Sequence, residues 1–248
     1  MMRNAAYPPA RHSALRGGAI TAMAVGVSVI LAGTALYASG AGLAVAAAGF
    51  AIVIAVMLCG LVYSGIAAPF GAANTITLGR AGMIMIVAGF AVDTTSYGSG
   101  AWWIAASLAV CAFLLDGVDG WAARRGGQCT GFGARFDMEI DAVFALVIAA
   151  VLWQAGKVGA WIMLIGALRY IFILAGGLYP PMLRPLPPSN RRRAVCAFQG
   201  GALCIALAPF VSAGAATGLA GAALLATAAS FAIDTIWLLR QQTESPLR

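Results

Sequence analysis

The chemistry of this chain is concentrated in carboxylates that lie close together in the sequence. Of its eight Asp and Glu residues, five fall within a stretch of 26 residues: Asp116, Asp119, Asp137, Glu139 and Asp141. The first two aspartates are three apart and the last two are four apart, so each pair shares one face of a helix. Four such carboxylates repel one another unless cations neutralise them, and hard oxygen ligands suit divalent cations such as Mg²⁺ or Mn²⁺. The spacing predicts a site for two divalent cations, which could clamp a diphosphate.

The residues around these acids suit a bulky phosphorylated ligand. Four glycines leave room beside the carboxylates for the backbone to approach such a ligand: Gly117, Gly120, Gly131 and Gly133. Arg124 and Arg125 lie one turn beyond Asp119 and can offer planar guanidinium groups to phosphate oxygens. Glu139 is two positions from Asp137 and is expected to point off the face that Asp137 shares with Asp141, so we interpret it as a non-ligand.

Elements that could hold this cluster are apolar helices. Hydrophobic residues make up 62% of the 248 positions and charged residues only 9%, and the mean hydropathy is +0.91. About 20 apolar residues cross a bilayer as a helix, and the chain has eight apolar runs, at about 18–38, 42–64, 75–95, 101–119, 137–155, 158–177, 195–214 and 217–239. The expected fold is therefore all-α, a polytopic membrane helical bundle in which the short break between the fourth and fifth runs makes them antiparallel neighbours.

The distribution of basic residues predicts the orientation of this bundle. With a cytoplasmic N-terminus, twelve arginines fall on the cytoplasmic side: Arg3, Arg11, Arg16, Arg124, Arg125, Arg135, Arg184, Arg191, Arg192, Arg193, Arg240 and Arg248. The opposite loops then hold only Lys157, as the positive-inside rule requires. Both termini and the carboxylates are thus expected on the cytoplasmic side of the cell inner membrane. The net charge of +7 suits anionic headgroups and phosphorylated substrates better than nucleic acid.

The spacing of the acids also matches a known signature. The chain reads Asp116-Gly-Val-Asp119-Gly120-Trp-Ala-Ala123-Arg124 and, after eight residues, Gly133-Ala-Arg-Phe-Asp137-Met-Glu-Ile-Asp141. This resembles the pattern D-x2-D-G-x2-A-R-x8-G-x3-D-x3-D of the CDP-alcohol phosphatidyltransferases, with all eight fixed positions matched. Asn74, Thr77 and Arg80 resemble the N-x2-T-x2-R of the first core helix of that family, more weakly. The resemblance covers residues 70–240, so we expect a six-helix catalytic core at 70–248 and, at 1–69, an N-terminal tail with two additional transmembrane helices.

The resemblance implies an activity and a role for each matched residue. Members transfer a substituted phosphate from a CDP-linked donor to an alcohol and release CMP, as in phospholipid biosynthesis. By this resemblance Asp116, Asp119, Asp137 and Asp141 would bind the metals, and Asp141 would also act as general base on the acceptor hydroxyl. The residues expected at the CDP donor are Gly120, Ala123, Arg124, Gly133, Asn74 and Thr77. The family also implies a homodimer with its site open to the cytoplasm.

The acceptor is predicted from the remaining arginines. Arg169 lies within an apolar run, where an arginine is a functional candidate by default, and Arg191, Arg192 and Arg193 precede the seventh run. With CDP-diacylglycerol as donor, these four arginines favour a phosphorylated polyol, glycerol 3-phosphate first and inositol phosphate second. Arg169 could instead make a structural ion pair, and the run of three arginines could simply obey the positive-inside rule. A buried Asp234 would need a partner that the sequence does not identify.

Two alternative functions stay open at this point. One is the reverse arrangement, in which a CDP-choline or CDP-ethanolamine donor reacts with diacylglycerol. The other is a non-enzymatic divalent-cation carrier, although a carrier would be expected to place acids near the bilayer midplane on broken helices.

Arg80 lies one turn inside the third run and could be structural or functional.

Overall fold

The computed structural model describes residues 8–37, 40–64, 70–92, 98–125, 130–184 and 186–243, with side chains of α4 described as far as Gly117. The helices are α1 (Pro8–Leu36), α2 (Gly40–Ser64), α3 (Gly71–Gly89), α4 (Ser99–Arg125), α5 (Gly131–Gln154), α6 (Leu164–Leu178), α7 (Asn190–Leu207) and α8 (Ala213–Thr243). Short 3₁₀ segments, η1 (Ala160–Met163) and η2 (Pro180–Leu183), flank α6. The all-helical prediction is confirmed, and each predicted run corresponds to one helix. The ends differ, since α1 begins at Pro8 and α4 continues to Arg125.

Six of the described helices are long and apolar enough to cross a membrane. The two that do not qualify, α5 and α7, carry in their first halves three of the clustered acids (Asp137, Glu139 and Asp141) and the three-arginine run, respectively. Only a helix satisfies its own backbone hydrogen bonds in hydrocarbon, so apolar segments of this length fold as helices there. The chain is a polytopic helical membrane protein, with charged residues grouped in the first halves of α5 and α7.

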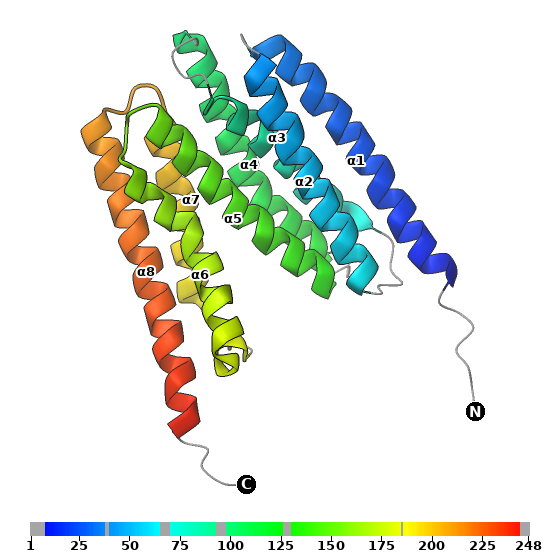
Figure 1. Cartoon of the computed structure of the whole chain (residues 1–248), viewed down its shortest axis with the longest axis vertical. Coiled ribbons are helices and arrows are strands. Elements are labelled where there is room, and N and C mark those ends of the chain that lie inside the picture. Colours follow the sequence, from blue (N-terminus) through cyan, green and yellow to red (C-terminus); the bar gives the residue numbers. More distant parts are fainter. Residues whose placement is uncertain are drawn as a thin grey trace.

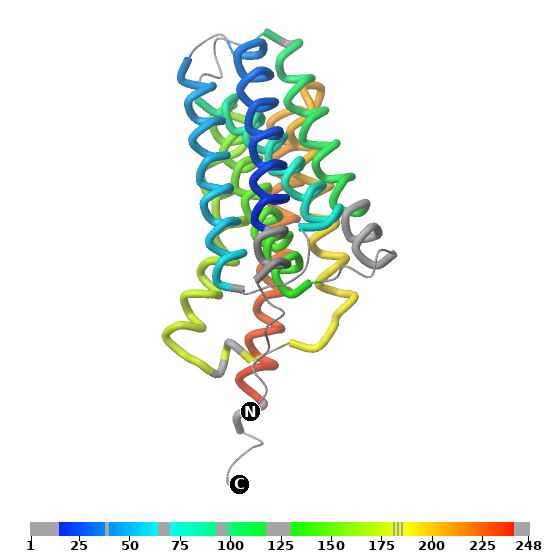
Figure 2. The backbone as a smooth tube through the Cα atoms, turned by 90° about the vertical axis from the view of Figure 1, so that its right-hand side faces the viewer, coloured from blue at the N-terminus to red at the C-terminus, as the bar shows by residue number. Residues whose placement is uncertain are grey.

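The helices run roughly along the long axis of the molecule (Figures 1 and 2). The first residues of α1 and α5 and the last residues of α8 lie at the same, lower end in Figure 1. We call this the aspartate end, because the first turns of α5 contain Asp137 and Asp141. The connection from α6 to α7 projects beyond the lower end of α2 (Figure 2).

The α1–α2 hairpin packs closely on α3 through glycines. A Cβ added at Gly82 would lie 2.6 Å from Val25 of α1, and one added at Gly49 would lie 2.5 Å from the sulfur of Met85. At Gly89 the backbone itself intervenes, since a Cβ there would lie 2.7 Å from the carbonyl oxygen of Gly42. The absence of side chains at these positions lets the helices approach closely, as small residues do in membrane bundles.

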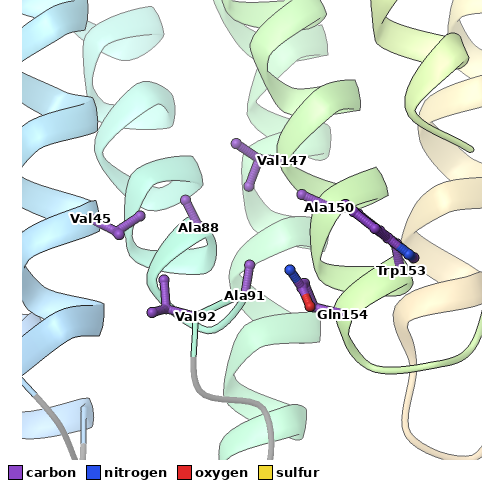
Figure 3. A pocket seen from close by; sticks show the side chains of 8 residues that line it. All are labelled: Val45, Ala88, Ala91, Val92, Val147, Ala150, Trp153 and Gln154. Carbon is purple, nitrogen blue, oxygen red and sulfur yellow. The ribbon is translucent and has the colours of Figure 1, made fainter. Parts of the chain in front are cut away.

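A cavity of about 400 Å³ lies between α2, α3 and α5 at the end opposite the aspartates (Figure 3). Its lining is apolar except for the polar atoms of Trp153 and Gln154 near the end of α5. None of the described residues that line this cavity is ionisable. The clustered titratable groups of the described chain lie at the aspartate end.

The contact at Gly89 generates a stability prediction. Gly89→Ala should lower the unfolding temperature in detergent, because a methyl group would meet the Gly42 carbonyl and the Tyr37 ring and overpacking costs about 1–3 kcal/mol. Gly79→Ala is the matched control in the same helix, because a Cβ at Gly79 has no neighbour within 4 Å. The control should hold or raise the unfolding temperature, since Ala favours a helix over Gly by about 0.8–1 kcal/mol. Equal behaviour of the two variants would contradict close hairpin packing.

Candidate active site

One buried arginine joins the acids of two helices. Arg80 of α3 is only 2% exposed, and its Nε donates to the carbonyl of Ala112 at 3.0 Å. Its Nη1 lies 2.9 Å from Asp116 Oδ1 and 2.8 Å from Asp137 Oδ1, and its Nη2 lies 2.9 Å from Asp141 Oδ1. A planar guanidinium with several donors in fixed directions can serve partners on α4 and α5 together. This contact brings the acids into one cluster.

The three carboxylates form a compact group of oxygen ligands. One oxygen from each of Asp116, Asp137 and Asp141 lies within 4.8 Å of the others. Their side chains are 37%, 35% and 45% exposed, so the cluster is open on one side. The side chain of Asp119, the fourth predicted ligand, lies outside the described residues. The structure thus assembles three of the four predicted ligands, across the α4–α5 connection.

The start of α5 explains how its acids are positioned. Thr130 has extended backbone dihedrals and caps the helix, because its hydroxyl accepts from the amide of Gly133 at 3.0 Å. A Cβ at Gly133 would lie 2.8 Å from Oδ1 of Asn74, so α3 and α5 meet closely here. The cap fixes the first turn of α5, and with it the face that carries Asp137 and Asp141 one and two turns later.

Three of the six residues predicted to bind the CDP donor lie in one region of the described structure. Asn74 and Gly133 are neighbours, and Thr77 is buried on the same helix as Asn74 with its hydroxyl donated to the Ala73 carbonyl at 3.0 Å. The side chains at the other three predicted positions lie outside the described residues: Gly120, Ala123 and Arg124. The described part of this group lies within two turns of Arg80, beside the carboxylates.

Arg169 of α6 is paired with Glu139 of α5 through its Nη2. Its Nε is buried and has no hydrogen-bond partner among the described residues. Glu139 therefore points away from the carboxylate cluster, toward α6. The predicted acceptor arginine makes the structural ion pair that the sequence left as an alternative, and it retains one free donor.

The arginines at the start of α7 meet the last helix. Asp234 of α8 is 7% exposed and accepts hydrogen bonds from Nη2 of Arg191 and, at 3.2 Å, from Nη1 of Arg192. Nη1 of Arg191 also donates to the carbonyl and hydroxyl of Ser230, at 2.8 and 3.0 Å. The partner that a buried Asp234 requires is thus a pair of arginines, and Arg193 remains exposed.

Cys196 of α7 lies near two of the carboxylates and two of the arginines. It lies one turn after Arg192 on α7, within electrostatic reach of Asp116 and Asp141 and also of Arg169 and Arg192. Arg169 and Arg192 therefore lie in the same region of the aspartate end as the acids. Their guanidinium groups are held by Glu139 and Asp234, so an anionic ligand would have to share them.

Two residues of this region were not predicted as site residues. Arg80 had a signal in the sequence, because it is an intramembrane arginine and the last position of the N-x2-T-x2-R segment. Glu139 had no comparable signal, since its partner Arg169 is 30 positions away. Helical periodicity gave the face of α5 on which Glu139 lies but not the helix that faces it.

The donor set fits a hard divalent cation. Carboxylate oxygens are the ligands that Mg²⁺ and Mn²⁺ prefer, and three of them converge here. The charge also fits, because Arg80 compensates one of three negative charges and leaves about two for a divalent ion. The fourth aspartate and a bound diphosphate would add the negative charge that a second ion needs.

Comparison with known proteins gives one finding. A model of the family described as CDP-alcohol phosphatidyltransferase matches residues 70–234, which include every described residue of the carboxylate cluster. No curated protein and no solved structure matches the chain.

The contacts of Arg80 generate a prediction about stability and metal. Arg80→Met should lower the free energy of unfolding in a chelator by about 1–3 kcal/mol, less than the loss of a fully buried pair, because it leaves three partly exposed carboxylates without their cation. Adding Mn²⁺ should then raise the unfolding temperature of Arg80→Met by more than that of the wild-type protein. Thermal unfolding in detergent measures both effects. Arg169→Met, which removes an arginine with a single carboxylate partner, is the control. Unfolding of Arg80→Met at the wild-type temperature in chelator would contradict the assigned role.

Proposed function

The chain belongs to the CDP-alcohol phosphatidyltransferase family, and from that premise we propose that it moves a phosphatidyl group from CDP-diacylglycerol to a small alcohol. Members of this family are transferases of substituted phosphate groups, so the chain is an enzyme. The observation that carries the proposal is the convergence of Asp116, Asp137 and Asp141 around Arg80. The family match favours an enzyme over the cation carrier. For the donor, we propose CDP-diacylglycerol in preference to CDP-choline or CDP-ethanolamine.

The carboxylates would hold Mg²⁺ or Mn²⁺. Asp116, Asp119, Asp137 and Asp141 are the proposed ligands, and the bound ions would supply electrostatic stabilisation to the diphosphate of the donor. Asn74 and Gly133, with Thr77 behind them, would line the cytidine end together with Gly120, Ala123 and Arg124. The position of Asn74, Thr77 and Gly133 near Arg80 supports this arrangement, because the diphosphate must lie against the ligands that hold the ions.

Asp141 is the proposed general base. It is the most exposed of the three described aspartates, so an acceptor can reach it from the open side. The acceptor hydroxyl would give its proton to the Asp141 carboxylate while its oxygen forms a bond to the phosphorus of the phosphatidyl group. The bond from that phosphorus to the bridging oxygen breaks, and the electron pair leaves with CMP.

The proposed acceptor is a phosphorylated polyol, with glycerol 3-phosphate preferred to inositol phosphate. Arg169 supports this choice, since its buried Nε has no partner among the described residues and can donate to a phosphate. Arg192 lies at the start of α7, and its proximity to Cys196, which Asp116 and Asp141 also approach, supports its access to the same region. Arg191 precedes it and shares its partner Asp234. Arg193, which is exposed, would complete the set.

The proposed setting is the cell inner membrane, with both termini and the aspartate end on the cytoplasmic side. The excess of arginines in the loops of one side supports this orientation. We also propose a homodimer and a division into an N-terminal hairpin at 1–69 and a catalytic core at 70–248. The beginning of the family match at residue 70 supports that boundary.

The test of this function is release of CMP from CDP-diacylglycerol by the purified protein. Release should require both Mg²⁺ or Mn²⁺ and an acceptor, and a screen of glycerol 3-phosphate, inositol phosphate, inositol and serine identifies the acceptor. Asp141→Asn should lower kcat by about 10²–10⁴-fold, as loss of a general base does. Asp116→Asn should mainly raise the metal concentration required. Full activity in excess chelator would overturn the mechanism, and near-normal turnover of Asp141→Asn would remove that residue from its role.

The acceptor site generates a separate prediction. Arg169→Gln should raise the KM of a phosphorylated acceptor about ten- to a hundredfold, the usual strength of a hydrogen bond to a charged group. The KM of CDP-diacylglycerol should stay nearly constant, because the donor is bound elsewhere. Arg184→Gln, an exposed arginine of the α6–α7 connection, is the control and should change neither value. An unchanged acceptor KM in Arg169→Gln would favour a non-phosphorylated alcohol.

A further inference from the structure

A second concavity lies at the aspartate end, between the N-terminal hairpin and the catalytic region. It is a groove of about 620 Å³ between α2 and α5, and its lining includes Val56, Met57, Phe132, Arg135, Phe136 and Glu139. We call it the α2–α5 groove. One wall belongs to α2, which precedes the region matched by the family model at 70–234. The groove exists only because the hairpin packs beside the catalytic region.

The groove lies on the opposite side of α5 from the carboxylate cluster. Successive residues of a helix are about 100° apart, so Glu139 is turned by about 200° from Asp137. The contacts agree, because Asp137 binds Arg80 of α3 whereas Glu139 binds Arg169 of α6. A ligand in the α2–α5 groove would therefore be separate from a donor whose diphosphate lies at the carboxylates.

The surface of the groove is amphipathic. Met57, Phe132 and Phe136 are buried apolar residues of its walls, and Val56 is 56% exposed. Arg135 is exposed and has no acidic partner in the part of the chain whose side chains the structure describes. Glu139 is already neutralised by Arg169, so one positive charge remains uncompensated. The groove combines an apolar floor with a single cation near the end of the helices.

The size of the groove favours a thin occupant. A helix with its side chains is about 10–12 Å across, so 620 Å³ would enclose only about 5–8 Å of one. A helix of a second copy could therefore insert only a few side chains into the groove. Cavities of about 300–1,000 Å³ are typical of small-molecule ligands. A hydrocarbon chain with an anionic group at one end fits both the shape and the charge.

We propose that the α2–α5 groove binds a phospholipid with an anionic headgroup, drawn from the surrounding leaflet. Its phosphate accepts from Arg135, and an acyl chain lies along Val56, Met57 and Phe132. Basic side chains near a membrane surface attract anionic lipids in this way. The lipid is not the substrate, and its binding does not depend on transfer at the carboxylates. In this proposal the function of the N-terminal hairpin is to form one wall of a lipid-binding site.

Lipid binding to the full chain in detergent tests this proposal without measuring activity. Native mass spectrometry would follow titrations with phosphatidylglycerol and with phosphatidylcholine of the same acyl chains. The wild-type protein should bind phosphatidylglycerol more tightly. Arg135→Gln should weaken phosphatidylglycerol about fivefold, the effect of one basic residue near an anionic headgroup, and weaken phosphatidylcholine less, because its choline cation offsets the charge of its phosphate. Val56→Trp should weaken both lipids, because an indole would fill the groove.

Matched controls separate the groove from the rest of the surface. Arg16→Gln removes an exposed arginine, and Met23→Trp adds an indole at a 71% exposed position of α1; neither should alter binding. Asp116→Asn should also leave binding unchanged, which separates this lipid from one held at the carboxylates. Equal binding of both lipids by wild type and Arg135→Gln would overturn the proposal. So would a dimer without bound lipid that Val56→Trp dissociates, because a second copy would then cover the groove.

Discussion

The structure depends on neutralising charges among apolar helices, where an unpaired charge is unfavourable. At the aspartate end, Arg80 pairs with the carboxylates. Its guanidinium is buried, and each of its three nitrogens has a partner: the Ala112 carbonyl, Asp116 with Asp137, and Asp141. An arginine or a carboxylate alone in this environment would be expensive, so the group is stable only as a set. The contacts of Arg80 consequently fix the relative positions of three helices, α3, α4 and α5, at the aspartate end.

The same constraint applies to the other charges of the bundle. Glu139 and Arg169 join α5 to α6, and Asp234 joins α8 to two arginines at the start of α7. At the opposite end, Nζ of Lys157 donates to the carbonyls of Ala206 and Ala208, at 3.2 and 2.6 Å, and so joins the segment after α5 to the end of α7. Burial lowers the pKa of Lys157 from its usual value. Each of these charges thus connects two elements instead of simply facing solvent.

The sequence was sufficient for the helices and for the acidic cluster, because both are local patterns. Apolar runs determine the spans, and spacings of three and four determine which aspartates share a face. The partners of those faces could not be predicted in the same way. Arg80 meets Asp141 across 61 positions, and Arg191 meets Asp234 across 43. Neither contact follows from periodicity, since it depends on which helices become neighbours. The glycine contacts between the hairpin and α3 were missed for the same reason.

The cavity between α2, α3 and α5 has a mechanical consequence. Ion pairs join helices at the aspartate end, whereas the opposite end contains about 400 Å³ of apolar space. Side chains around such a space lack part of their packing contacts, so they resist displacement less than a filled interior does. The bundle is therefore joined by ion pairs at one end and has locally looser apolar packing between α2, α3 and α5 at the other. A change in the lateral pressure of the bilayer would displace these loosely packed side chains before it moved the oxygens around Arg80.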